Sequence, residues 1–182
     1  QQLDTQSSAA ARMSLGAGFW QHDLNIPLSM DLAPASLFQR HRHYLVFDLE
    51  TKTLVDAVGG WKNFKQLEVS IGCAYDSKTD EVLVFHEKDM PALCRLCEER
   101  LVVGYNIIGF DLPIMEKYGL NMENLDTFDI MLEVQSVSNW RFVKLEKVAQ
   151  ATLGTGKSAE GTMAVEWWNE GKIDKIIEYC KQ

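Results

Sequence analysis

The sequence predicts an α/β domain with a mixed β-sheet, and three observations support this fold class. Residues 44–51 form an apolar run of the kind found in strands. Residues 67–75 alternate strictly, and residues 81–86 resume a β-branched pattern after a turn-forming segment, which predicts a β-hairpin. From residue 89 onward, apolar runs alternate with segments of helical spacing. A hairpin followed by alternating strands and helices is typical of a mixed sheet flanked by helices.

The segment after the hairpin predicts a helix, a central strand and a turn, in that order. Asp89 is placed to cap a helix that has Pro91 in its first turn and reaches Arg100. Residues 101–105 are apolar without a break, as expected of a strand covered on both faces, and residues 106–110 form the turn. The remaining expected elements are a helix over 111–118, a short strand over 125–128, a helix from about Asp129, a helix in which Phe142, Leu145, Val148, Ala149 and Thr152 recur before a C-cap at Gly154, and helices over 159–169 and from Ile173 to the end.

Length and composition favour one compact domain preceded by an arm. The chain has 182 residues, of which 46% are hydrophobic and 24% charged. Residues 1–40 keep no period of 2 or 3.6, so we expect an N-terminal arm or linker there and the domain over 41–182. The apolar runs are far shorter than a membrane span, and the first residues lack a signal-peptide pattern. We therefore expect a cytoplasmic protein without a membrane partner.

The cysteines show neither a disulfide framework nor a complete zinc motif. Cys73, Cys94, Cys97 and Cys180 fall at no framework spacing and are expected to be free thiols. The Cys94-x-x-Cys97 pair has no second Cys or His pair at ligand spacing, so helix packing is the favoured interpretation.

The net charge of −8 limits how the protein can hold a polyanion. With 26 acidic residues against 18 basic ones, the chain opposes non-specific attraction to a phosphate backbone. If nucleic acid is the substrate, metal ions or a neighbouring domain must help to hold it.

Acidic side chains at the ends of two predicted strands are the candidates for chemistry. Asp48 and Glu50 alternate in the first strand and therefore point to the same face. Two carboxylates at the end of an apolar strand need a metal ion or a basic partner, and a hard divalent cation is the natural candidate. Asp111 follows the strand at 101–105 and would join them if the two strands are neighbours. Taken one at a time, a polar strand end and a helix cap explain these residues equally well.

Two motifs in this region resemble those of the DEDD-type 3′-5′ exonucleases of the ribonuclease H-like fold. Phe47-Asp48-Leu49-Glu50-Thr51 resembles their first motif. Asn106 to Asp111 is similar to the second motif, in the form found in proofreading domains of family-B DNA polymerases, and residues 101–106 resemble the same strand in helicase-associated and phage-type exonucleases. The last helix, with Tyr179, resembles the lead-in to the third motif, Tyr-x-x-x-Asp. The resemblance begins at about residue 43.

The resemblance implies an enzyme that hydrolyses phosphodiester bonds at the 3′ end of single-stranded or frayed nucleic acid, with DNA favoured. Asp48, Glu50 and Asp111 would hold two Mg²⁺ or Mn²⁺ ions, roughly 3.5 to 4 Å apart in such sites, and Tyr179 would orient the attacking water as in the tyrosine subclass. All-oxygen ligands favour Mg²⁺ or Mn²⁺ over zinc. The family's fourth acid would fall immediately after Gln182, so we expect the domain to be cut just before it and the site to be incomplete without it.

The resemblance also implies a setting and further contacts. It suggests work beside a polymerase or helicase module, in cis or in trans, in DNA repair or replication. Thr51, Asn106 and Phe110 lie within the motifs and are candidate substrate contacts. The alternative is a ribonuclease H-like module that binds nucleic acid or protein without turnover, which the missing fourth acid favours and the convergent acids oppose.

Other signals are weaker. The segment Gly154 to Ser158 lacks the first glycine of a phosphate loop, because Ala151 holds that position, and Lys157 is a candidate phosphate contact or a solvated lysine. Base stacking is conceivable for Phe142 and the tryptophans at 167–168, but core packing is favoured for Phe142 and at least one tryptophan. The basic cluster 40–43 is a candidate phosphate contact, although such runs are usually a solvated element end. Asp126 and Asp129 are candidates to assist the site, but capping of the following helix explains one of them.

Overall fold

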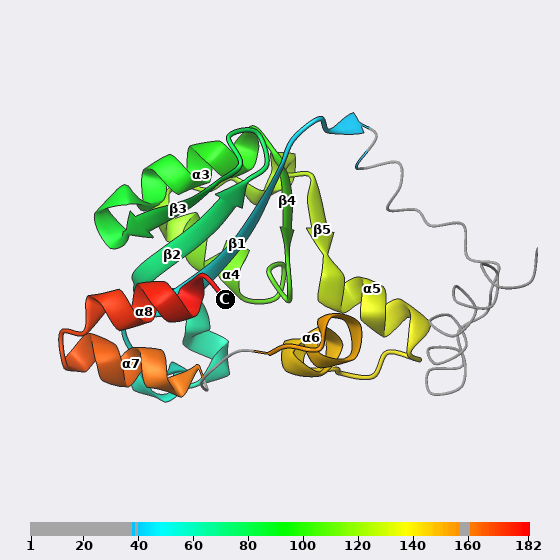
Figure 1. Ribbon diagram of the computed structural model, residues 1–182. Coiled ribbons are helices and arrows are strands. Elements are labelled where there is room, and N and C mark those ends of the chain that lie inside the picture. Colours follow the sequence, from blue (N-terminus) through cyan, green and yellow to red (C-terminus); the bar gives the residue numbers. More distant parts are fainter. Residues whose placement is uncertain (1–37, 39, 157–160) are drawn as a thin grey trace, which may run out of the picture.

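The computed structural model describes residues 38, 40–156 and 161–182 and has a five-stranded mixed sheet at its centre (Figure 1). The strands are β1 (Tyr44–Thr51), β2 (Val69–Asp76), β3 (Glu81–His86), β4 (Leu101–Gly104) and β5 (Thr127–Asp129). The α-helices are α3 (Met90–Glu98), α4 (Asp111–Met115), α5 (Ile130–Val137), α6 (Leu145–Leu153), α7 (Thr162–Asn169) and α8 (Ile173–Cys180). The sheet order is β3-β2-β1-β4-β5. The predicted fold class is therefore confirmed.

The pairing pattern makes β1 the central strand and leaves part of one edge uncovered. β1 pairs with β2 in antiparallel fashion, and β2 and β3 form the predicted hairpin. On its other side β1 runs parallel to β4, but the paired residues of β1 are only Tyr44, Leu45 and Val46. β4 ends at Gly104. The second half of β1, which carries the acidic residues, therefore extends past the end of β4.

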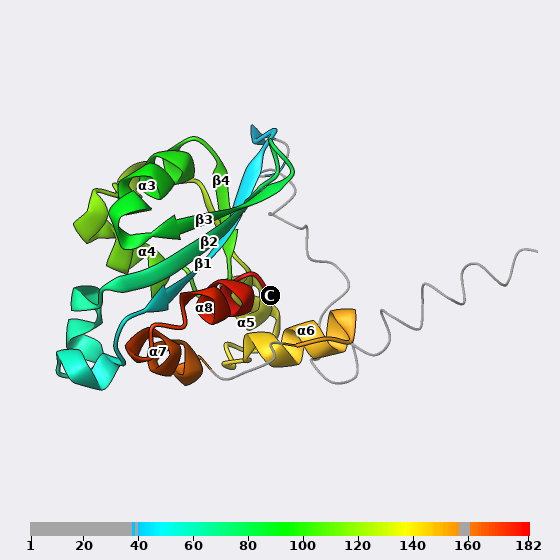
Figure 2. The ribbon, with the colours of Figure 1, turned by 60° about the vertical axis from the view of Figure 1, so that its left-hand side comes forward.

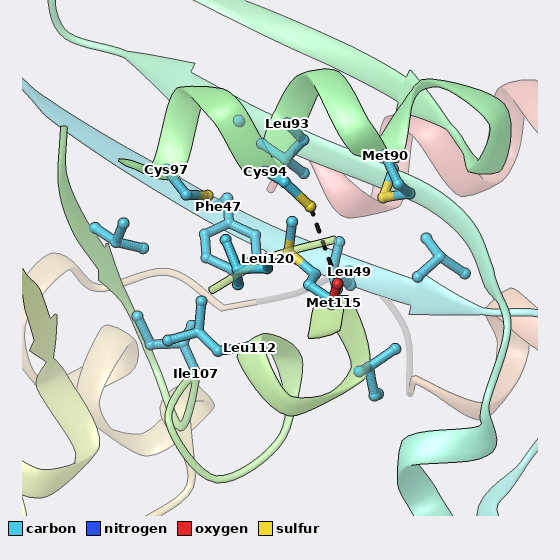
Figure 3. Packing of buried hydrophobic residues seen from close by; sticks show 14 of the residues in the cluster. Phe47, Leu49, Met90, Leu93, Cys94, Cys97, Ile107, Leu112, Met115 and Leu120 are labelled. Atoms are coloured by element: carbon cyan, nitrogen blue, oxygen red, sulfur yellow. Dashed lines mark hydrogen bonds between the residues drawn. The ribbon is translucent and has the colours of Figure 1, made fainter. Parts of the chain in front are cut away.

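Alternation along β1 separates two hydrophobic clusters on opposite faces of the sheet. Leu45, Phe47 and Leu49 pack with α3 and α4, and Figure 3 shows Phe47 and Leu49 lying between these helices. The Cys94 Sγ of α3 lies 4.0 Å from the Met115 carbonyl of α4, which joins the two helices within this cluster. Burial of such apolar surface is the main driving force that holds the helices on the sheet.

The opposite face of the sheet is covered by α7 and α8, which lie side by side in both ribbon views (Figure 2). Ile71 and Cys73 of β2 pack there against Ile176, Tyr179 and Cys180 of α8. Trp167 and Trp168 of α7 pack against the same cluster. Core packing of at least one tryptophan is thus confirmed.

Several boundaries differ from the sequence expectation. The helix expected over 111–118 ends at Met115 and continues as a 3-10 turn, Glu116–Tyr118. Two further 3-10 turns, Val55–Val58 and Trp61–Gln66, follow β1 and were not predicted. Gly59 and Gly60 join these turns with positive φ values of 88° and 93°, a backbone conformation that suits glycine.

The prediction that Phe142 packs in the core is wrong. Phe142 is 69% exposed and lies before α6, which begins at Leu145. The helical spacing continues back to Phe142, but Lys144 has an extended backbone, so the helix begins after it. At the other end of α6 the predicted C-cap is confirmed, because Gly154 adopts a left-handed conformation with φ of 70°.

The cysteine predictions are confirmed, because all four residues are buried thiols that form no disulfide. Burial raises the pKa of Cys94 to about 11 and that of Cys97 to about 12. Both thiols of the Cys-x-x-Cys pair therefore act as apolar core groups of α3. None of the helices in the described part of the chain is long and apolar enough to cross a membrane. Residues 1–37, 39 and 157–160 lie outside the described residues, and with them lie most of the predicted arm and Lys157.

Gly104 is a position where the fold leaves no room for a side chain. A Cβ there would overlap the side chain of Ile107 and would lie 3.2 Å from the Phe47 carbonyl oxygen. We expect Gly104→Ala to lower the free energy of unfolding by about 1 to 3 kcal/mol, as overpacking does. Urea unfolding measures this change. Gly161→Ala is the matched control, because its Cβ would lie 3.9 Å from the Tyr179 hydroxyl, and an equal loss in both variants would contradict the packing argument.

Candidate metal centre and active site

The candidate site lies at the end of β1, on the face covered by α8. Asp48 and Glu50 point to the same face, and their partners on β2 are Cys73 and Ile71. The ligand atoms of Asp48, Glu50 and Cys180 all lie within 4.8 Å of one another. The predicted pair of carboxylates is therefore assembled, and the third member of this tight group comes from the last turn of α8.

Asp111 reaches the same acids from the other side of β1. It is the first residue of α4, it is 4% exposed, and the segment that leads to it begins at the end of β4. Burial raises the pKa of Asp111 well above its usual range, the negative charge of Asp48 raises it further, and Glu50 adds to the effect. The backbone amides of Asp111 and Leu49 oppose these causes only in part. The three predicted acids therefore lie close enough for the charges of Asp48 and Glu50 to affect Asp111.

The turn between β4 and α4 is held by Asp129 of β5. The Asn106 N–H donates to Asp129 Oδ1 over 2.8 Å, and the Ile108 N–H donates to Oδ2 over 3.0 Å. Asn106 itself has a positive φ of 62°, which asparagine tolerates better than most residues. Asp129 also caps α5 by accepting from the Met131 N–H at 3.0 Å. Capping therefore explains Asp129. Asp126 has a different partner, because its Oδ2 accepts a hydrogen bond from His41 Nε2 over 2.7 Å.

The candidate substrate contacts occupy different parts of this region. The Thr51 hydroxyl, at the end of β1, donates to the Thr53 carbonyl over 2.8 Å. The Asn106 side-chain oxygen lies close to Gly109, so that a Cβ added at Gly109 would be 2.5 Å from it. Phe110 precedes Asp111 and is half-buried against the first hydrophobic cluster.

An aromatic group beside Asp111 was missed by sequence reasoning. Phe64 stacks on Phe110 with ring centroids 5.7 Å apart and an interplanar angle of 14°. Trp61 meets Phe110 edge-on at 6.0 Å, and its side chain remains 70% exposed. The available signal was a Gly-Gly turn followed closely by two aromatic residues, shortly after the first acid motif.

Of the last helix, Cys180 lies with Asp48 and Glu50, and Tyr179 directly precedes it. Tyr179 is buried and meets the Trp167 ring edge-on at 5.9 Å. The Cys180 Sγ donates to the Asp48 carbonyl over 3.5 Å. A hydrogen bond with Cys73, burial and the charge of Asp48 raise the pKa of Cys180 above its usual range. Sequence reasoning missed Cys180, although Ile176, Tyr179 and Cys180 share one helical face and the spacing indicates that they point inward.

A model of the RNase H superfamily matches residues 45–182, which is most of the chain and all of the elements that form the site. The chain belongs to the RNase H superfamily. The family B DNA polymerase from the hyperthermophilic archaeon Pyrobaculum calidifontis is similar in structure at 15% identity and a TM-score of 0.54, over 75% of this chain and 22% of that chain. Exonuclease I is similar at 13% identity and a TM-score of 0.43, over 75% of this chain and 43% of that chain. No curated protein matches the sequence.

The family match and the polymerase likeness show the fold of this RNase H superfamily domain. The chain spans less than half the length of either structural neighbour. The polymerase likeness supports the arrangement of a mixed sheet flanked by helices, as the sheet order itself does.

The donor groups of this RNase H superfamily domain fit a divalent cation. Asp48, Glu50 and Asp111 place carboxylates of like charge in a partly or fully buried region, which is unfavourable unless a cation compensates them. Carboxylate oxygens are the ligands that Mg²⁺ and Mn²⁺ prefer.

Proposed function

We propose that this domain is a metal-dependent 3′-5′ exonuclease of the DEDD type, acting on single-stranded or frayed ends, with DNA favoured over RNA. The observation that carries the proposal is the pair Asp48 and Glu50, whose ligand atoms lie within 4.8 Å of one another and of Cys180. Buried Asp111 lies close enough for their charges to add to the effect of burial in raising its pKa. A binding module has no physical need to bury like charges together, whereas a metal-dependent hydrolase does. Membership of the RNase H superfamily supports hydrolysis of nucleic acid as the reaction class.

In this proposal each site residue has a distinct role. Asp48, Glu50 and Asp111 would hold Mg²⁺ or Mn²⁺, which when bound activates water and stabilises the leaving 3′ oxygen. Asp129 is a positioning residue, because it holds the turn that delivers Asp111. Tyr179 would orient the attacking water, and its packing against Trp167 limits the motion of its ring.

The resemblance puts the family's fourth acid at the position after Gln182, and we propose that an aspartate added there would act as a further metal ligand. This position lies three residues beyond Cys180, where α8 ends. The C-terminal end follows α8, which packs against β1 and β2 (Figures 1 and 2). An acid there would join the carboxylates of β1 and α4.

The substrate would lie against the exposed groups beside the acids. Trp61, Phe64 and Phe110 offer an aromatic surface on which an unpaired base can stack. Thr51 and Asn106 are proposed as further contacts to the 3′ nucleotide, and Lys157 as a phosphate contact. A polymerase or helicase module, in cis or in trans, is the proposed source of the strand and of additional affinity.

The decisive test follows the fate of single-stranded DNA labelled at one end. In Mn²⁺ or Mg²⁺ the protein is expected to release mononucleotides from the 3′ end, and Asp48→Asn is expected to stop this release. Adding one aspartate after Gln182 should raise the rate, with an added asparagine as the matched control. Shortening from the 5′ end, or cuts in a closed circle, would contradict the proposal. Binding without hydrolysis, in both the original and the aspartate-extended chain, would favour the module without turnover.

A further inference from the structure

The connection between α5 and α6 exposes two large aromatic side chains together with basic residues. Trp140 is 70% exposed and Phe142 is 69% exposed. Arg141, Lys144 and Lys147 are exposed beside them. We call these five residues the 140–147 strip. It runs from the connection after α5 into α6, the yellow and orange helices of Figure 1.

The backbone of the strip is held in an unusual conformation that keeps Trp140 outside. Asn139 and Trp140 have positive φ values of 54° and 58°, a region that a bulky residue such as tryptophan rarely adopts. The Trp140 N–H nevertheless donates to the Gln135 carbonyl over 2.8 Å, which fixes the turn after α5. Strained backbone that the surrounding contacts maintain is a reason to look for a function there.

The strip is also connected to the candidate active site. The Tyr105 hydroxyl donates to the carbonyl of Val143, which lies between Phe142 and Lys144 of the strip. Tyr105 directly precedes Asn106, the first residue of the turn that leads to Asp111. The aromatic and basic groups are therefore anchored to the same end of β4 that delivers a catalytic carboxylate.

The charge of the strip is opposite to that of the protein. Its three basic residues face one acidic neighbour in the same segment, Glu146, whereas the whole chain has a net charge of −8. Within residues 40–156 and 161–182, the ion pairs formed involve other basic residues. Basic side chains that face solvent beside exposed aromatic rings suit a ligand that has negative charge and flat rings of its own.

We propose that the 140–147 strip binds an unpaired stretch of nucleic acid, with bases stacked on Trp140 and Phe142 and phosphates facing the three cations. A duplex keeps its base faces stacked on one another, so it cannot offer them to the rings, and a single strand can. The polarity of the bound strand rests on the proposed function. With the 3′ end at the acids, the strip holds the part of the strand that precedes that end. The strip thereby supplies affinity that the acidic net charge otherwise opposes.

The experiment measures binding of a fluorescent single-stranded oligonucleotide by anisotropy in EDTA, with every variant built on Asp48→Asn so that no strand is cleaved. Trp140→Ala with Phe142→Ala is expected to weaken binding by about tenfold or more, the effect of lost base stacking. The triple variant Arg141→Gln, Lys144→Gln, Lys147→Gln is expected to lower the slope of log affinity against log salt by about 2, from roughly 0.7 for each lost phosphate contact.

Matched controls separate the strip from general surface effects. Leu153→Ala removes an apolar side chain that is 75% exposed on the adjacent helix α6, and Lys78→Gln with Lys88→Gln removes two exposed charges elsewhere. These controls are expected to leave affinity and salt slope unchanged. Circular dichroism confirms that each variant is folded.

The outcomes distinguish this inference from the exonuclease proposal. If neither the parent protein nor the aspartate-extended protein hydrolyses DNA but the strip variants lose single-strand binding, the exonuclease proposal fails and the strip stands. Unchanged binding in both strip variants overturns the inference, whatever the hydrolysis assay shows. Equal affinity of the protein for duplex and single strand also overturns it. If the strip variants change self-association by sedimentation but not nucleic-acid binding, the strip is a protein contact and the inference fails.

Discussion

Replacing Asp111 with asparagine is expected to stop hydrolysis and, in the absence of metal, to stabilise the fold. Asp111 is 4% exposed and near Asp48 and Glu50, so its ionised form is unfavourable and its pKa is raised. Asparagine keeps the shape and removes the charge. Loss of one carboxylate weakens the hold on the metal, whose charge stabilisation is worth several kcal/mol, so the rate should fall by at least about 100-fold.

The raised pKa of Asp111 determines how the stability of the metal-free protein changes with pH. A folded-state pKa above the unfolded value of about 3.9 means that the folded protein binds the Asp111 proton more tightly. Below the unfolded pKa the carboxyl is protonated in both states and costs nothing. As the pH rises through the raised pKa, the metal-free protein should lose stability, and Asp111→Asn should lose less.

Thermal melting at acidic and at neutral to alkaline pH, with EDTA and with Mn²⁺, measures these effects. Metal that binds only the folded state raises the melting temperature by mass action, and this rise should shrink in Asp111→Asn. Asp126→Asn is the control, because Asp126 contacts His41 and should leave the metal effect unchanged. An undiminished Mn²⁺ effect in Asp111→Asn would remove Asp111 from the proposed metal centre.

Replacing Arg100 with alanine is expected to lower the free energy of unfolding by about 3 to 5 kcal/mol, the cost of breaking a buried ion pair. Arg100 Nε lies 3.2 Å from Asp76 Oδ1, and Nη2 lies 3.3 Å from Oδ2. The two side chains are 8% and 3% exposed. The variant would leave the Asp76 carboxylate buried without its cation, which is why the loss exceeds that of an exposed pair.

Asp76 also gives the pH direction for this pair. Burial raises the pKa of Asp76, but the Arg100 guanidinium and the Lys78 N–H, which donates over 2.9 Å, lower it more, so the net pKa lies below its usual value. The stability from this pair is therefore present above the unfolded pKa of about 3.9 and is lost as the pH falls through the lowered folded pKa.

Urea unfolding at neutral pH tests the Arg100 prediction. Arg95→Ala, an exposed change on α3, should stay within about 0.5 kcal/mol of the parent protein. The double variant Asp76→Asn with Arg100→Met should recover much of the loss, since no buried charge remains. A small effect of Arg100→Ala alone would show that Asp76 finds water or another partner.

Sequence periodicity predicted the sheet well, for a local reason. The side chain of each strand residue points opposite to its neighbours, so the pattern of residues 44–51 determines that Asp48 and Glu50 share a face. The turn residues at 76–80 likewise lie in the observed hairpin between β2 and β3. Features of this kind depend on residues that are adjacent in the chain.

Helical spacing was less reliable at element ends. It predicted that Phe142 packs in the core, whereas the chain turns at Asn139 and Trp140 and leaves Phe142 exposed before α6 begins. Spacing reports which residues would share a face if the helix continued, and it does not report where the helix starts. The same limit applies to α4, which is shorter than the apolar pattern indicated.

The sequence by itself determined the composition of the candidate site in part: two acids on one face of a central strand, and a third acid at the start of the helix after the next parallel strand. Only the tertiary structure decided how they meet. β4 pairs with the first residues of β1 and ends at Gly104, so the turn held by Asp129 can bring Asp111 to the uncovered edge of β1. The packing of α8 on β2 then adds Cys180 to Asp48 and Glu50. Strand order, strand length and helix docking depend on contacts between distant parts of the chain, which local periodicity does not contain.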